Sequence, residues 1–290
     1  MSTRITSLVT GAAAAAVLLC ACSAGSRQSP DAAVTPPPLD GARAPASLAA
    51  ALAALPLAAY EPSAALRRTV HQAVGILEVA CMKQRGYHGF RPAPTVRSPG
   101  TVPGGGGPFG YVNAGYAARR GFGLPEPRTA ADGGDPAQTR ASMACLARAQ
   151  QKVLLTPHPL TRTDQGLLFG LYLKSESDAI DDKRVAAATR AWAACMKADG
   201  FNDGSPASLA SGSWPGPPSA REIATAKADA ACTSSANLAG IYFAALAGYE
   251  RELAAPHAKA LAAVRRANQS QAARAAQIVA AGPAGVLNRP

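Results

Sequence analysis

Charged and aromatic side chains are scarce in this sequence of 290 residues, at 16% and 5% respectively. So few charges argue against a polyelectrolyte chain, and a mean hydropathy of +0.01 argues against a polytopic membrane protein. Strand patterns are almost absent outside short pieces such as residues 110–112, whereas apolar residues often recur at helical spacing. The sequence therefore predicts an all-α fold.

Motifs of known enzyme chemistry are missing as well. There is no Gly-x-Ser-x-Gly elbow, and the Ser-x-Ser sequence at 175–177 lacks the lysine of penicillin-recognising enzymes. Residues 105–110 formally fit a dinucleotide fingerprint, but Pro108 lies inside it and no strand precedes it. We therefore predict a flexible loop at 105–110, no cofactor and no catalytic residue.

Metal-binding patterns are also lacking. None of the four histidines has a histidine or carboxylate four residues later, and no cysteine pair has the C-x2–4-C spacing of zinc sites. We therefore predict no metal site.

One acidic cluster remains, formed by Glu176, Asp178, Asp181 and Asp182. It precedes an apolar helical stripe, and the helix dipole favours carboxylates at such a start. The alternative is a cell-wall-modifying hydrolase, in which Asp181, Asp182 and Glu222 converge as catalytic acids.

The first 21 residues predict a lipoprotein signal peptide. Arg4 supplies a positive charge, and the uncharged, largely apolar run 5–21 follows it. The Leu-Cys-Ala-Cys sequence at 19–22 resembles a bacterial lipobox, which implies diacylglycerol on the sulfur of Cys22. Two acyl chains hold a protein firmly to a bilayer, so we expect an anchor at the outer face of the cell membrane. An ordinary secretory signal, cleaved further along, is the alternative.

A Pro/Ala-rich tether is predicted over residues 22–47. This segment contains Pro36-Pro37-Pro38 and shows no apolar periodicity. Because such a composition cannot bury a core, we expect an extended, disordered spacer.

The rest of the sequence contains a repeated motif. Residues 80–87 align with residues 194–201, and five of the eight positions are identical. We interpret the chain as two related helical halves, 48–158 with a Pro/Gly-rich insertion at about 91–135, and 159–281, followed by a tail at 282–290. In each copy the glycine, Gly86 or Gly200, occupies the position of a left-handed helix cap. Its neighbours then have the spacing of a Schellman motif.

Further helices follow from the spacing of apolar residues. We predict helices over about 63–85, 137–155 and 179–199, and a long one over 219–253. Pro256 should break or kink this last helix. Residues 257–281 contain few large apolar side chains, and we expect that segment to be solvated.

Four cysteines remain after Cys22 is acylated and Cys20 is removed with the signal peptide. Outside the cytoplasm an even set indicates disulfides, with three possible connectivities. The repeat favours one bond within each half, whereas bonds between the halves remain the alternative. Each loop closure is worth roughly 3–4.5 kcal/mol in the chain-entropy model. The favoured pairs are Cys81–Cys145 and Cys195–Cys232.

Several of these stretches resemble a family of secreted proteins and lipoproteins of high-GC Gram-positive bacteria with no established activity. The similarity covers most of residues 48–266, and it rests on the segments 55–60, 81–87, 118–123, 192–201 and 228–232. It implies an extracytoplasmic compartment and a similar architecture, and it implies no chemistry. Pro256 departs from the uninterrupted helix that the family leads us to expect.

A positive charge is the one feature that suggests a partner; the alternative is that arginine-rich usage only reflects genome composition and keeps the domain soluble. The formal net charge is +11, and the last forty residues contain six Lys or Arg against Glu252 alone. Anionic lipid headgroups and wall polymers are the available counter-charges in such an envelope. We expect a lipid-anchored envelope protein that binds or assembles with an anionic polymer or another envelope protein and catalyses no reaction. No motif supports nucleic-acid binding.

Overall fold

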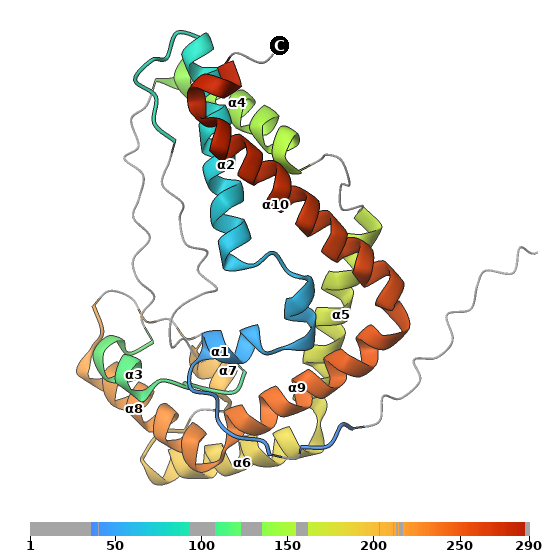
Figure 1. The fold of residues 1–290 in the computed structure, drawn as a ribbon. Helices are drawn as coiled ribbons and strands as arrows, with labels where there is room; N and C mark the ends of the chain where they lie inside the picture. Colours follow the sequence, from blue (N-terminus) through green and yellow to red (C-terminus); the bar gives the residue numbers. More distant parts are fainter. Residues whose placement is uncertain are drawn as a thin grey trace, which may run out of the picture. The chain divides into compact units, whose positions relative to one another are not determined.

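The computed structural model describes residues 36–39, 41–92, 108–122, 135–154, 162–202, 204–210, 212, 214 and 217–287. The predicted signal peptide and Cys22 lie outside these residues. The described chain is helical and contains no strand, which confirms the all-α prediction (Figure 1). The elements, in chain order, are α1 (Leu48–Ala53), η1 (Pro56–Tyr60), α2 (Ala64–Gln84), α3 (Ala114–Arg120), α4 (Pro136–Leu154), α5 (Arg162–Asp181), α6 (Lys183–Ala198), α7 (Pro206–Ala210), α8 (Ala220–Ser235), α9 (Leu238–Ala254), η2 (Ala255–His257) and α10 (Ala258–Leu287).

The two copies of the repeated motif end their helices in the same way. Gly86 after α2 has a φ of 91°, and Gly200 after α6 has a φ of 86°. The N–H of Tyr87 donates to the carbonyl of Met82 at 3.0 Å, and that of Phe201 donates to the carbonyl of Met196 at 2.9 Å. These are the bonds of a Schellman cap, so the predicted helix ends are confirmed.

Two disulfides join helices immediately before these caps. Cys81 on α2 is bonded to Cys145 on α4, and Cys195 on α6 is bonded to Cys232 on α8. The Cα atoms are 5.6 Å apart in both bonds, a distance that disulfides commonly span. The favoured connectivity is thus confirmed.

Helix α10 packs along α2 and α4, as Figure 1 also shows. It contributes Ala275 and Ile278 to a core with Val74 and Leu77 of α2. The expectation that residues 257–281 are solvated is therefore wrong. The segment buries Leu261, Val264 and Ile278 at wide spacing, with alanines and two amide side chains between them, and such a mixture gives a weak apolar signal in the sequence.

A second core is formed by α6, α8 and α9 around Trp192. Residues 108–122 of the predicted insertion also belong to it, because Phe109 and Tyr111 are buried there and α3 packs on α8. The part of the expected flexible loop that the structure describes, 108–110, is therefore packed. The long helix expected over 219–253 is divided into α8 and α9 by Asn237, whose φ is 46°.

No single described helix is long and apolar enough to cross a bilayer. By length and composition alone, one bent pair passes the same test, Ala220–Ser235 with Leu238–Pro283, which meet at 62°.

The Schellman caps can be tested with Gly200→Val. A β-branched residue fits the left-handed region poorly, so the free energy of unfolding should fall by about 1–2 kcal/mol. Gly204→Val is the matched control, because Gly204 has an ordinary φ and open space around its Cβ position. Equal urea midpoints for Gly200→Val and the parent protein would contradict the cap assignment.

Candidate functional site

The end of the predicted tether lies against α9. We call residues 36–39 and 41–45 the strap. A Cβ atom built on Gly248 would be 2.2 Å from the ring of Pro37, and one built on Gly240 would be 2.6 Å from the backbone carbon of Arg43. Gly240, Ala244 and Gly248 follow one another at intervals of four residues, so α9 presents a smooth face to the strap.

Two hydrogen bonds fasten the strap to the helices. Arg184 at the start of α6 donates from Nη1 to the carbonyl of Pro37 at 2.6 Å, and Asn237 donates from Nδ2 to the carbonyl of Ala42 at 3.0 Å. Prolines have no N–H to donate, so side chains that donate to carbonyls are a natural means of holding such a segment. The described residues of the strap are thus held against the helices, so the expectation of a disordered spacer over 22–47 is wrong for them.

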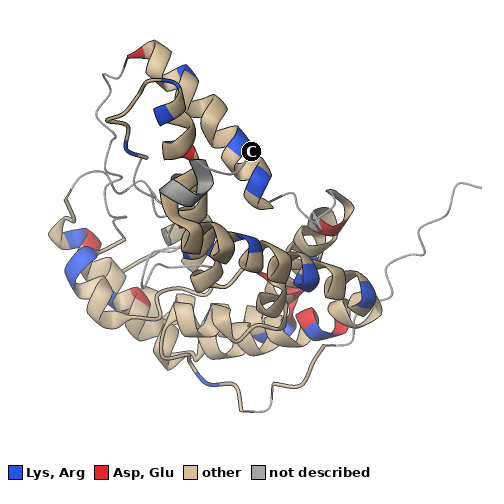
Figure 2. Ribbon diagram, turned by 45° about the horizontal axis from the view of Figure 1, so that its top comes forward, with Lys and Arg blue, Asp and Glu red and all other residues tan. Residues whose placement is uncertain are grey.

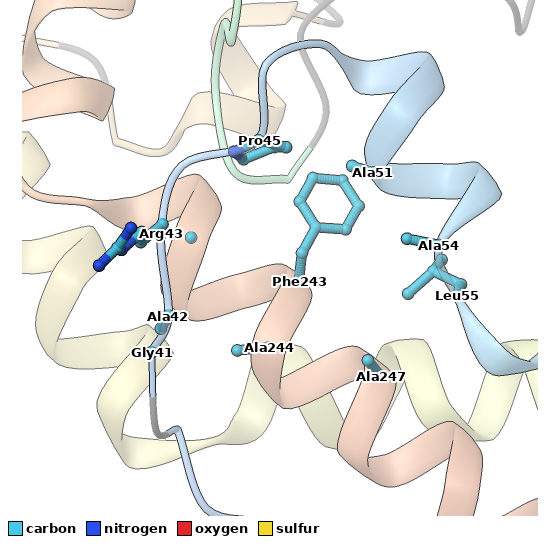
Figure 3. A pocket seen from close by; sticks show the side chains of 11 residues that line it. Gly41, Ala42, Arg43, Pro45, Ala51, Ala54, Leu55, Phe243, Ala244 and Ala247 are labelled. Atoms are coloured by element: carbon cyan, nitrogen blue, oxygen red, sulfur yellow. The ribbon is translucent and has the colours of Figure 1, made fainter.

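A cavity of about 250 Å³ lies between the strap, α1 and α9 (Figure 3). The strap contributes Gly41, Ala42, Arg43 and Pro45 to its walls. The end of α1 contributes Ala51, Ala54 and Leu55, and α9 contributes Gly240, Phe243, Ala244 and Ala247. Phe243 projects from α9 between the strap and α1, opposite Leu55. Among the described residues that line the cavity, Arg43 is the only charged one.

Two carboxylates of α8 bind the backbone of residues 108–122, which belong to the predicted insertion. Asp229 accepts hydrogen bonds from the backbone N–H of Tyr111 at 3.0 Å and from the indole N–H of Trp192 at 2.8 Å. Glu222 accepts from the backbone N–H of Phe122 at 2.8 Å. Both acids are almost fully buried, and each supplies an acceptor that a non-helical N–H requires.

Asp182 is the N-cap of α6, as the helix-start interpretation of the acidic cluster expects. Glu176, Asp178 and Asp181 lie in the last turns of α5, so that interpretation is wrong for them. The Asp182 carboxylate pairs with the Arg184 guanidinium at 2.6 Å and accepts from the Tyr249 hydroxyl at 3.1 Å. Hydrogen bonds from Arg184 lower the pKa of Asp182 to about 2, against the opposing effect of burial. Asp181 is exposed at the end of α5. The cavity beneath the strap is lined by none of the three acids of the hydrolase alternative.

Glu250 on α9 is a buried acid that the sequence analysis did not identify. Its side chain is fully buried, and its Oε2 accepts from the backbone N–H of Leu57 in η1 at 2.8 Å. Within the described part of the chain, its Oε1 has no hydrogen-bond partner. Burial raises the pKa of Glu250 to about 7, the Leu57 bond opposes the rise, and the nearby Glu61 carboxylate adds to it. A glutamate in the middle of an apolar helical stretch was the available signal.

The four predicted disulfide cysteines offer no metal site. Cys195 and Cys232 lie with Asp199 at distances at which three ligand atoms can hold an ion. Their sulfurs are bonded to each other, however, and are therefore not thiolate ligands.

Helix α4 contains three basic residues and no acidic one. Helix α10 likewise contains Lys259, Arg265, Arg266 and Arg274 and no acidic residue. The first three are exposed, and Arg265 also lies over the ring of Tyr60 at 5.0 Å. Figure 2 shows Lys and Arg distributed over several helices besides, so the predicted basic character is present on the folded protein.

No family model, no curated protein and no solved structure matches this chain.

The protonation state of Glu250 can be tested by measuring the free energy of unfolding as a function of pH. The folded protein raises the pKa of Glu250 from 4.5 to about 7, so folding favours the protonated side chain. The contribution of this group to the free energy of unfolding is therefore complete below pH 4.5 and is lost as the pH rises through 7. The free energy of unfolding should thus fall by about 2–3 kcal/mol between pH 5 and pH 8 on account of this group. Glu250→Gln should remove most of that decrease in urea titrations. Glu252→Gln, at an exposed position on the same helix, should leave it unchanged, and an equal pH slope in all three proteins would contradict the assignment.

The seating of the strap can be tested with Gly248→Ala. The added methyl group cannot coexist with Pro37 in its present position, so the strap should detach at this end. Hydrogen exchange measured by mass spectrometry should become faster at the amides of residues 39–47. Gly170→Ala on α5 is the matched control, because a Cβ there meets nothing within 4 Å. Unchanged protection of the strap in Gly248→Ala would show that the strap contact is not as described.

Proposed function

We propose that this chain is a lipid-anchored protein of the cell envelope that binds or assembles with another envelope component and catalyses no reaction. The observation that carries the proposal is the strap. The segment that continues from the predicted lipidated residue, Cys22, is fastened to α6 and α9 by Arg184 and Asn237. The strap thus joins the sequence that follows the predicted anchor to the helical part of the protein.

The contacts of the acids support a binding role over a hydrolase. Asp182 caps α6 and is paired with Arg184, and Glu222 holds the backbone of Phe122. An acid pair for hydrolysis needs one proton donor and one ionised partner that face a shared substrate. The depressed pKa of Asp182 favours the ionised form, and its arginine contact occupies the oxygens that a substrate would require.

The partner that we propose is an anionic wall polymer or an acidic surface of an envelope protein. The exposed Lys259, Arg265 and Arg266 of α10, with no acid on that helix, support this choice. We also propose that the two halves arose by duplication. In support, each half contains a Schellman cap beside a disulfide with the same Cα separation.

Metabolic labelling with radioactive palmitate in a Gram-positive host tests the anchor. The parent protein should incorporate label and fractionate with membranes, because Cys22 follows a small residue at the end of the apolar run. Cys22→Ala should lose both properties. Cys20→Ala is the control, and it should retain them. Label that persists in Cys22→Ala would disprove Cys22 as the lipidated residue. A parent protein released to the medium without label would disprove lipid anchoring.

A further inference from the structure

We propose that the exposed face of α5 is a contact between two copies of this chain, which pair around a two-fold axis that runs roughly along the helix. This inference goes beyond the proposed anchoring and does not depend on it. It uses only the residues of α5 from Gly166 to Ile180, all of which the structure describes. Three observations carry it: exposed apolar side chains, two glycines that packing within one copy does not require, and the way in which these features lie beside each other.

Large apolar side chains are left in solvent along one side of α5. Phe169 is 63% exposed, Leu173 is 52% exposed and Ile180 is 46% exposed. Their spacing of four and seven residues places them in one row on the helix. The other side of α5 packs inward, where Leu171 and Ala179 are buried. Single apolar residues are common on a protein surface, whereas several on one helix face indicate an interaction site.

Gly166 and Gly170 weaken α5 without a reason inside the described part of one copy. A Cβ atom built on either glycine would meet nothing within 4 Å, and neither glycine has a positive φ. Alanine would therefore fit at both positions, and it stabilises a helix interior more than glycine does. Both glycines are exposed. Small residues at this spacing allow the backbone of another helix to approach closely.

The large and the small residues lie side by side on α5. We call Phe169 and Leu173 the ridge, and Gly166 and Gly170 the groove. Each pair is four residues apart, so the ridge and the groove have the same inclination on the helix surface. At 3.6 residues per turn, the groove is displaced from the ridge by about 60° around the helix.

This arrangement is complementary to itself. A two-fold axis along two facing helices places the ridge of each copy opposite the groove of the other, because the rotation reverses left and right across the contact. The same rotation leaves heights along the axis unchanged, so Phe169 of one copy meets Gly170 of the other. A second copy therefore supplies both matching surfaces by symmetry, whereas a different protein would need its own ridge and groove of this size.

A lipid surface fits this face less well. Glu176 is exposed at the edge of the ridge and Asp181 is exposed at the end of α5. Anionic headgroups repel both carboxylates. A fluid bilayer also contains no rigid ridge that could fill the glycine groove.

The contact is small. The face from Gly166 to Ile180 is roughly 21 Å long at 1.5 Å per residue. Three half-exposed side chains and a groove on each copy bury less than the roughly 1,200–2,000 Å² of a stable interface. We therefore expect a reversible dimer whose dissociation constant is roughly micromolar or weaker.

Sedimentation velocity of the mature chain tests the pairing, with Cys22→Ser to prevent acylation. The parent protein should shift from monomer toward dimer as its concentration rises from roughly 5 to 500 µM. Phe169→Glu should raise the dissociation constant by about 10-fold or more, since it replaces the ring on the ridge by a carboxylate. Met143→Glu is the matched control, because Met143 on α4 is 66% exposed and lies outside this face, and it should associate as the parent does.

Gly170→Leu separates pairing from folding. The position is exposed and its Cβ has open space within one copy, so the melting temperature of the monomer should not fall. The filled groove should nevertheless raise the dissociation constant of the dimer by about 10-fold or more. Leu173→Cys tests the symmetry, because residue 173 is central on the face and should form a disulfide with its own counterpart. Ala191→Cys, at an exposed position on α6, should form none.

Three results would overturn the proposal. One is a parent protein that stays monomeric at the highest concentration. Another is dimerisation that survives both Phe169→Glu and Gly170→Leu unchanged, because the copies would then meet elsewhere. The third is a monomeric parent that binds neutral phosphatidylcholine vesicles through Phe169, which would assign the face to lipid. None of these results depends on the lipid expected on Cys22, so failure of this proposal and failure of lipid anchoring are separately visible.

Discussion

Buried carboxylates that accept backbone N–H groups are the interaction on which the arrangement of this protein depends. Glu250 holds Leu57 of η1, Asp229 holds Tyr111, and Glu222 holds Phe122. In each case the acid belongs to a helix and the donor to a non-helical or short 3-10 segment far away in the sequence. Such segments contain N–H groups without helical partners, and burying them unpaired would cost about 1–3 kcal/mol each. The acids remove that cost and fix the position of the segment at the same time.

The disulfides and helix caps act at shorter range, and they fit an alanine-rich chain. Alanine favours helix but buries little apolar area, so helix pairs in such a protein gain less from packing than leucine-rich pairs do. A covalent bond between α2 and α4, and another between α6 and α8, restricts the unfolded chain and compensates for this. The small residues around each bond also let the paired helices approach closely.

Helix α9 connects these structural features to the proposed function. Its Gly240, Ala244 and Gly248 face receives the strap, and its Phe243 forms part of the apolar cavity. Glu250 on the same helix fixes η1, which follows α1 and thereby positions the opposite wall. The site is therefore made by two neighbouring segments, the strap and the end of α1, and by α9, which is distant from both in the sequence. Its apolar character follows from the residues of α1, the strap and α9 together.

The sequence by itself determined what depends on neighbouring residues. Helical periodicity located α2, α4 and α6, and the Met-x3-Gly-aromatic spacing located the caps at Gly86 and Gly200, because these features involve residues within one or two turns. The matched motifs also favoured the disulfide pairing. Only the tertiary structure decided where the strap lies, that α10 is packed on α2, and that Glu250, Asp229 and Glu222 hold distant backbone. Each of these features depends on small residues or on a single acid, and the role of such a residue is set by the distant segment that packs against it. The spacing of residues along the chain contains no information about which segment that is.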